Sequence, residues 1–235
     1  SILNWDFVCE GCGGYINGST WLNQFINSYE TKYGHKPPVD VWAIDIYPID
    51  WSHTPNQNPN ALVYYKGNYV THSTIAIDQI KTFRNFLTTI PEYQSTPIWI
   101  TEIAIHVGFD GWDWVNKSTG VSCTTNQEIN SGNCKIVPIG KYHWDLMSDY
   151  LIKVLNWLET KQDAYNISRW FFFHTWQDVN NPRSASGYMG IYFYDEGVSG
   201  ANLTCLGEVY KAYSLNQSST PPSIRCDSDG KTVFD

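Results

Sequence analysis

The sequence predicts an α/β fold, and more specifically a TIM-type (β/α) barrel of which about four βα units are recognisable. Three observations favour this fold. Apolar runs typical of buried strands alternate with segments of helical periodicity along the 235 residues. Polar loops follow the carboxyl ends of the expected strands, as they do in such barrels. A complete barrel needs eight units in ~250 residues, so the long loops of this chain leave it with a partial barrel.

The first unit is expected at the N-terminus. Residues 1–7 are apolar and aromatic, which indicates a strand. A helix is expected from Ser19 or Thr20 onward, because apolar residues then recur every three to four positions as far as Tyr33. Gly34 supplies the residue type that commonly ends a helix.

The second and third units follow the same order. Residues 39–47 form an almost continuous apolar run with β-branched members, which predicts a strand covered on both faces. A polar loop over 48–70 leads to a helix with apolar positions between 77 and 90. A short strand is expected at 97–102, followed by a long loop that contains Trp112 and Trp114.

The last unit occupies the C-terminal third of the chain. A helix is expected over about 141–161 and an apolar strand over 167–176. A final helix spans about 203–215, and the tail 216–235 is expected to be irregular. The four units in succession predict parallel strands joined by crossover connections.

Composition excludes several classes of function. With 42% hydrophobic and 16% charged residues the chain is an ordered globular protein. Its net charge of -8, without a Lys/Arg cluster, argues against a nucleic-acid partner. There is no apolar run of ~18 residues, so we expect no membrane span. The start at Ser1 shows no signal peptide and indicates a processed or truncated chain.

The six cysteines are an even number at local spacings, which predicts disulfides and an oxidising, extracellular compartment. The expected pairs are Cys9–Cys12, Cys123–Cys134 and Cys205–Cys226. A redox or zinc motif at Cys9 and Cys12 is the alternative. A redox motif favours a helix after the first cysteine, and a zinc ribbon needs a second CxxC, which the sequence does not contain. Candidate glycosylation sequons begin at Asn17, Asn116, Asn166, Asn202 and Asn216.

Polar and aromatic side chains stand where the expected strands end. Asp45 and Tyr47 close the second strand, and Glu102 closes the third. The fourth strand ends at His174 and Trp176. Because the chemistry of a (β/α) barrel lies at the carboxyl ends of its strands, these residues are the candidate site.

Three segments carry a resemblance to a known family. They are VDVWAIDIYP at 39–48, PIWITE at 97–102 and RWFFF at 169–173. They resemble the clan A (β/α)8 retaining glycoside hydrolases, nearest the alkali-sensitive-linkage-type glycosyl hydrolase catalytic core. The likeness covers roughly residues 1–213 and corresponds to the C-terminal half, strands five to eight. It implies a barrel half over 1–215 and a disulfide-tethered tail over 216–235.

The resemblance implies a secreted enzyme that hydrolyses a β-linked polysaccharide with retention and needs no cofactor. Glu102 matches the nucleophile, and no metal site is expected because His spacing does not support one. Retention needs a second carboxyl ~5–5.5 Å away, but the chain contains no Asn-Glu dipeptide, so the family's acid/base residue is expected to be missing from this chain. Asp45 is a possible internal substitute. Expected substrate-binding residues are Asp45, Tyr47, Trp51, His106, Trp112, Trp114, His174 and Trp176.

Two alternatives remain open at this point. Glu102 could be a structural carboxylate that pairs with a buried arginine. The chain as a whole could be a non-catalytic carbohydrate-binding or assembly-forming extracellular glycoprotein built on the same scaffold. The expected partners are therefore a carbohydrate and, for an incomplete barrel, its own N-terminal half or copies of itself.

Overall fold

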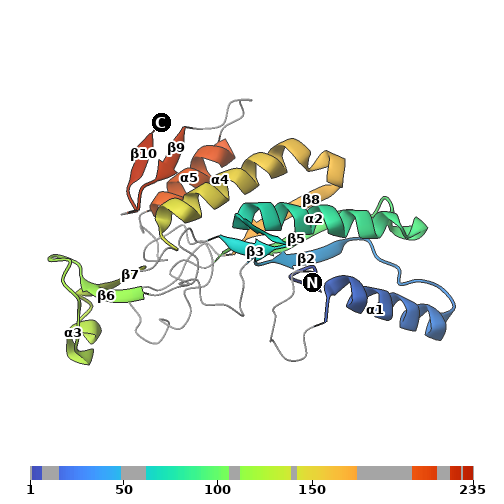
Figure 1. The fold of residues 1–235 in the computed structure, drawn as a ribbon, viewed down its shortest axis with the longest axis horizontal. Coiled ribbons are helices and arrows are strands. Elements are labelled where there is room, and N and C mark those ends of the chain that lie inside the picture. The colour runs from blue at the N-terminus through green and yellow to red at the C-terminus, as the bar shows by residue number, and fades with distance from the viewer. Residues whose placement is uncertain are drawn as a thin grey trace.

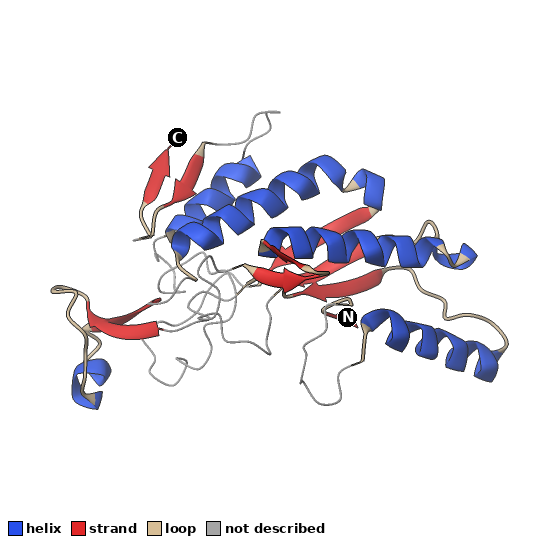
Figure 2. Cartoon of the chain, in the orientation of Figure 1, coloured by secondary structure: helices blue, strands red, loops and turns tan. Residues whose placement is uncertain are grey.

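The computed structural model shows a parallel sheet flanked by helices, with small antiparallel hairpins at its periphery (Figures 1 and 2). The sheet contains β1 (Ile2–Leu3), β2 (Trp42–Ile46), β5 (Ile98–Ile103) and β8 (Ile167–Phe172), in that spatial order. All three neighbouring pairs are parallel. The structure describes residues 2–6, 16–48, 62–105, 112–138, 142–173, 203–215, 223–228 and 230–234.

The prediction of a TIM-type (β/α) barrel is wrong. In the described part of the chain the sheet is open, with β1 at one edge and β8 at the other. A barrel closes only when tilted and staggered strands pair around the whole circumference, which four strands do not achieve. The prediction failed because alternation of strands and helices is common to open α/β sheets and to barrels, and so does not distinguish the two folds. The fold is a mixed α/β structure with an open parallel sheet.

Four long helices accompany the sheet: α1 (Gly18–Tyr33), α2 (His72–Thr88), α4 (Trp144–Lys161) and α5 (Cys205–Leu215). Helix α4 contacts both α2 and α5, so these three form one layer, as Figure 1 shows. Their apolar stripes meet the sheet in one core. Its fully buried members include Ile44, Ile80, Phe83, Ile98, Ile100, Leu151 and Leu158.

Helix boundaries follow their local chemistry. Gly34 adopts the left-handed conformation, with φ of 75°, and its N–H donates to the carbonyl of Glu30 at 2.8 Å. This confirms Gly34 as the stop of α1. Thr71 precedes α2, and its hydroxyl accepts a hydrogen bond from the N–H of Thr74. A hydroxyl in this position satisfies a helix donor that otherwise has no partner.

Three hairpins lie in segments that were expected to be loop or tail. They are β3 (Val63–Tyr65) with β4 (Asn68–Val70), β6 (Trp112–Asn116) with β7 (Cys134–Pro138), and β9 (Ile224–Cys226) with β10 (Thr232–Phe234). In the first, Lys66 and Gly67 both have positive φ, 47° and 88°. Two such residues give the turn twist that a two-residue hairpin needs. Shorter elements are α3 (Asn126–Asn130), η2 (Pro91–Tyr93) and η3 (Asp163–Tyr165).

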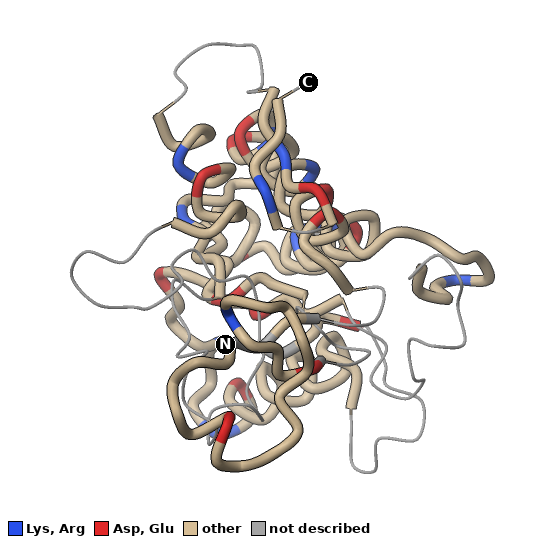
Figure 3. Tube along the Cα trace, turned by 90° about the vertical axis from the view of Figure 1, so that its left-hand side faces the viewer, with Lys and Arg blue, Asp and Glu red and all other residues tan. Residues whose placement is uncertain are grey.

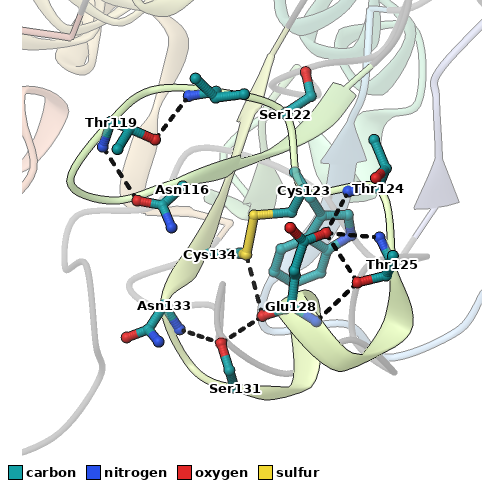
Figure 4. Close-up of a disulfide and its surroundings, with 12 residues drawn as sticks. Asn116, Thr119, Ser122, Cys123, Thr124, Thr125, Glu128, Ser131, Asn133 and Cys134 are labelled. Carbon is teal, nitrogen blue, oxygen red and sulfur yellow. Dashed lines mark hydrogen bonds between the residues drawn. A yellow bond between two sulfur atoms is a disulfide. The ribbon is translucent and has the colours of Figure 1, made fainter.

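Two of the predicted disulfides are confirmed. Cys123–Cys134 has a Cα–Cα distance of 6.6 Å and joins the hairpin β6–β7 to the segment before α3. Figure 4 shows this bond beside Glu128, whose carboxylate accepts from the N–H and hydroxyl of Thr125. Cys205–Cys226 joins the start of α5 to β9 across 5.7 Å. Cys9 and Cys12 lie outside the described residues.

Removing the two disulfides is expected to have different effects on global stability. Each bond closes a short loop, with sequence separations of 21 and 11, so chain entropy alone assigns each about 3 kcal/mol. Cys205–Cys226 fastens β9 against α4, where the N–H of Cys226 donates to Ser148 Oγ at 3.0 Å. Cys123–Cys134 fastens a peripheral hairpin instead. Cys205→Ser with Cys226→Ser should therefore lower Tm by ~6–12 °C.

The matched control is Cys123→Ser with Cys134→Ser, measured in the same calorimeter. It should lower Tm by less than half as much, because local opening of the hairpin leaves the sheet and its helices intact. Equal losses in the two double variants would contradict the distinction.

A buried histidine begins α2. His72 is 2% exposed, and its Nε2 lies 2.7 Å from the hydroxyl of Tyr142. Burial lowers the pKa of His72 to about 4. Between pH 6.5 and 4 the unfolded chain therefore binds a proton that the folded chain excludes. The contribution of the neutral ring to the free energy of unfolding is therefore complete above pH 6.5. It falls by roughly 3 kcal/mol as the pH is lowered toward 4.

Urea unfolding of the parent and of His72→Gln between pH 7 and pH 4 measures this effect. The variant is expected to lose much less stability over that window than the parent does. His35→Gln is the control, since it replaces an exposed histidine and leaves the surroundings of His72 intact. Parallel pH profiles for the parent and His72→Gln would refute the assignment.

Candidate functional site

The candidate site lies at the carboxyl edge of the two central strands. Asp45 at the end of β2 and Glu102 near the end of β5 are register partners in the parallel pair. Tyr47 follows β2 directly, and its hydroxyl donates a short hydrogen bond to Glu102 Oε2. The structure therefore brings together three residues that the sequence placed at this edge.

A β-bulge orients Glu102. The pairing of β2 with β5 runs Ile44 with Ile100 and then Asp45 with Glu102, so Thr101 is an extra residue in β5. Side chains alternate between the faces of a strand, and one inserted residue exchanges the faces beyond it. Without the bulge, Glu102 would share the helix-covered face with Ile98 and Ile100. With it, Ile103 takes that face and is fully buried, while Glu102 is partly exposed.

Asp45 is a buried carboxylate tied to its neighbours. It is 8% exposed and accepts a hydrogen bond of 2.6 Å from the hydroxyl of Thr101. A buried carboxylate is costly without such donors. The same hydroxyl lies 3.2 Å from the carbonyl of Ile44. The bulge residue Thr101 therefore also holds Asp45 in place.

Asn4 braces the site from β1. Its N–H donates to the carbonyl of Asp45 at 2.8 Å, and its Oδ1 accepts from the N–H of Tyr47 at 2.7 Å. Asn4 has φ of 50°, a conformation that asparagine tolerates better than most residues. These two bonds fix the backbone on both sides of Ile46, and so they set where the Tyr47 ring begins.

Tyr47 remains a neutral hydrogen-bond donor. Burial, followed by the hydrogen bond to Glu102 and the negative charge of that carboxylate, raises the pKa of Tyr47 far above its ordinary value. The ring is 8% exposed and meets Phe173 edge-on with centroids 6.2 Å apart. The phenol is therefore held in one orientation, with its O–H directed at Glu102.

In the described part of the chain, the buried arginine does not pair with Glu102. The buried Arg84 donates to the main-chain carbonyls of Thr96, Tyr93 and Gln94. Glu102 instead accepts a hydrogen bond from the neutral phenol of Tyr47.

The other expected substrate-binding residues are distributed differently. Trp51, His106, His174 and Trp176 lie outside the described residues. Trp112 is part of β6, but its side chain is not described. Trp114, also in β6, is 6% exposed and belongs to the core, which leaves little ring surface for stacking on a ligand.

Asn4 and Thr101 were not identified as site residues from the sequence. Asn4 follows the apolar Ile2–Leu3 directly, so the rule that selects polar residues at strand ends would have found it. Thr101 stands beside Glu102, but its contact with Asp45 depends on the bulge. The sequence pattern does not predict that bulge.

Three of the five sequon asparagines are described. Asn17 is exposed at the start of α1. Asn116 Oδ1 accepts from the N–H groups of Ser118 and Thr119 at 2.9 and 3.1 Å, as part of a turn. Asn166 Nδ2, the atom that a glycan would modify, donates to the carbonyl of Ser95 at 2.8 Å. Asn202 and Asn216 lie outside the described residues.

The described residues give no sign of a metal centre or of a basic patch. Among the described residues, His, Cys, Asp and Glu form no group of three or more that could hold a metal ion. Figure 3 shows Lys and Arg spread over several elements and interspersed with Asp and Glu. No helix of the described segments is long and apolar enough to cross a membrane.

Comparisons of the chain with protein-family models, with curated proteins and with solved structures gave no match. The interpretation of the site therefore rests on its geometry. That geometry consists of a partly exposed carboxylate with a neutral phenol donor, beside a second, buried carboxylate.

Proposed function

We propose that the chain is a secreted glycoside hydrolase-like domain that cleaves a β-linked polysaccharide with retention, and that Glu102 is its nucleophile. The observation that carries the proposal is the hydrogen bond from Tyr47 to Glu102 at the carboxyl edge of adjacent parallel strands. In open α/β sheets, ligands bind at the carboxyl ends of the strands. The resemblance of 97–102 to a nucleophile-bearing segment agrees with that position.

The chemistry assigns a role to each described side chain. Glu102 attacks the anomeric carbon, and a glycosyl–enzyme ester forms as the leaving oxygen departs. Tyr47 donates to the carboxylate before attack and orients the oxygen that reacts. Asp45 and Thr101 form the base of the site and hold the strand ends in register.

The reaction also requires a proton donor for the leaving oxygen. A retaining pair places its carboxyls about 5–5.5 Å apart. Asp45 is beside Glu102 in the sheet, but it is buried and accepts the hydrogen bond of Thr101, which suits a structural carboxylate. We therefore assign the acid/base role to a carboxyl beyond the described residues or on another polypeptide.

The extracellular assignment is supported by the cysteines. Two disulfides link segments 11 and 21 residues apart, and the described residues contain no free cysteine. Such bonds persist in oxidising compartments and are rare in the cytosol.

The experiment that tests the proposal follows the chain on a panel of soluble β-linked glucans. Reducing ends measure cleavage, and proton NMR of the first product identifies the anomer. Retention predicts that the β-anomer appears first and then mutarotates. Initial formation of the α-anomer would contradict the retaining mechanism. The absence of cleavage from every substrate would mean that this chain alone lacks the acid/base carboxyl, and it would favour a non-catalytic binding domain.

A non-catalytic carbohydrate-binding domain is the second candidate. The observation that favours it is the state of Asp45, which is engaged by Thr101 and so is poorly suited to donate a proton. Affinity electrophoresis on the same glucans separates the candidates. Retarded migration without cleavage supports the binding domain, whereas cleavage with retention supports the hydrolase.

A further inference from the structure

Helix α1 buries far less of its surface than its neighbour α2. Of its 16 residues only Gly18, Leu22 and Ile26 are buried, whereas nine of the 17 residues of α2 are. Helices of globular proteins gain most of their stability from packing an apolar face. The remaining apolar side chains of α1 therefore need an explanation.

Those side chains form a continuous aromatic surface. Trp21, Phe25, Tyr29 and Tyr33 follow one another at intervals of four residues, which places each beside the next along the helix. Successive ring centroids are 5.6, 6.3 and 4.5 Å apart, and the first two rings are parallel within 2°. Trp21, Phe25 and Tyr33 are 46%, 40% and 51% exposed. We call these four residues the aromatic face of α1.

We propose that the aromatic face of α1 is the interface of a homodimer, in which the α1 helices of two copies pack antiparallel about a two-fold axis that passes through this face at the level of residue 27. A two-fold interface must be complementary to itself. The aromatic face meets this condition, because its residues are spaced evenly on both sides of position 27. Trp21 of one copy then lies opposite Tyr33 of the other, and Phe25 lies opposite Tyr29.

Charge favours a second copy as the occupant. Each copy carries a net charge of -8, so two copies repel, and the repulsion at the contact is smallest where the surfaces that meet are neutral. Helix α1 contains one acid, Glu30, and one base, Lys32, and is therefore neutral. In the antiparallel arrangement Lys32 of one copy reaches the Trp21 end of the other. Its Nζ already lies 5.0 Å from the centroid of the Tyr33 ring in the same chain.

The area available indicates a weak dimer. An aromatic side chain can bury about 150–250 Å², so the three half-exposed rings offer roughly 300 Å² per copy. A standard stable interface buries about 800 Å² per partner. The neighbouring polar side chains of a helix about 24 Å long extend the contact.

The edge of the sheet offers further contact on the same flank. β1 is the outermost strand, and α1 begins directly against it, since a Cβ at Gly18 would lie 3.2 Å from Ile2 and 2.8 Å from Trp5. Figure 1 shows α1 and the N-terminus together at this end of the sheet. In the described part of the chain no strand pairs with the outer side of β1, and this edge lies on the same flank of the molecule as α1.

The test is the molar mass of the chain by light scattering and sedimentation between about 1 and 200 µM, the range in which an interface of this size associates. The parent is expected to move from 26.9 kDa toward twice that mass, 53.8 kDa, as concentration rises. Trp21→Gln with Phe25→Gln should weaken association at least tenfold. The matched control is Tyr64→Gln with Tyr69→Gln, which removes two aromatic rings that are 58% and 64% exposed on another surface.

A crosslink tests the geometry independently of affinity. Ser28 follows Trp21 by two helical turns and is exposed on the same side, whereas the exposed Asn23 lies on the opposite side. With a short bismaleimide, Ser28→Cys should give a dimer band and Asn23→Cys should not. Circular dichroism spectra of the two cysteine variants should match, which shows that both are folded.

Three outcomes overturn the proposal. The parent could remain at 26.9 kDa throughout the concentration range. The Trp21/Phe25 double variant could associate as strongly as the parent. Soluble β-glucan could quench the fluorescence of a monomeric parent through Trp21, which would identify the aromatic face as a carbohydrate platform. None of these measurements depends on Glu102, so failure of the dimer leaves the proposed hydrolase untouched.

Discussion

Glu102→Gln is expected to lower the turnover of a β-linked glucan by about 10³-fold or more while leaving affinity within a few-fold of the parent. The substitution removes the charge that attacks the anomeric carbon but keeps the shape of the side chain. Glutamine can still accept the hydrogen bond from Tyr47, so the Tyr47 side chain should retain its position. The loss should therefore fall on kcat rather than on KM.

Glu92→Gln is the matched control for this variant. Glu92 is an exposed carboxylate in η2, and its charge pairs with Lys36 at 3.0 Å. Removing it changes net charge by the same amount as Glu102→Gln but leaves the site intact. The control should keep parental kcat and KM. An active Glu102→Gln, with Glu92→Gln equally active, would eliminate Glu102 as the nucleophile.

Phe83→Ala is expected to destabilise the fold by about 3–5 kcal/mol, the largest stability effect predicted for this chain. Phe83 is fully buried in α2 and meets the ring of Trp5 edge-on with centroids 4.7 Å apart. Trp5 itself is 1% exposed and accepts a hydrogen bond at its carbonyl from Gln79 Nε2. Truncation thus leaves a cavity where α2 meets the segment that follows β1.

Denaturant unfolding monitored by circular dichroism measures this loss, and Tm should fall by at least 6 °C. Phe171→Ala provides the control, because Phe171 lies in β8 with 48% of its surface exposed. It should cost less than about 1 kcal/mol. A Phe83→Ala variant as stable as Phe171→Ala would mean that the contact between α2 and Trp5 does not hold the sheet edge.

Periodicity predicted the long elements well because the signal is local. The apolar runs of β2 and β5 formed where the sequence placed them, β8 formed over the described part of its expected range, and α2 formed with Ile90 just beyond its end. The hairpins β3–β4 and β9–β10 were missed because their strands have three residues each, too few to show an alternation. Whether the sheet closes into a barrel depends on contacts between strands that are distant in the sequence, and local patterns do not predict those contacts.

The candidate site was predictable in part for the same reason. Tyr47 and Glu102 stand at the ends of neighbouring apolar runs, so parallel pairing brings them to one edge. The side on which Glu102 emerges was not predictable. Counting alternate residues from Ile98 and Ile100 assigns Glu102 to the buried face, and the extra residue Thr101 reverses that assignment.

The bulge at Thr101 also determines how β5 can change over evolution. Deletion of a single residue in this strand moves every side chain beyond the deletion to the opposite face of the sheet, so that core positions become exposed and exposed positions become buried. Loss of Thr101 would turn Glu102 inward and Ile103 outward, whereas a point substitution at Thr101 would spare both. Lineages that vary this segment are thus expected to accumulate substitutions while its length stays constant.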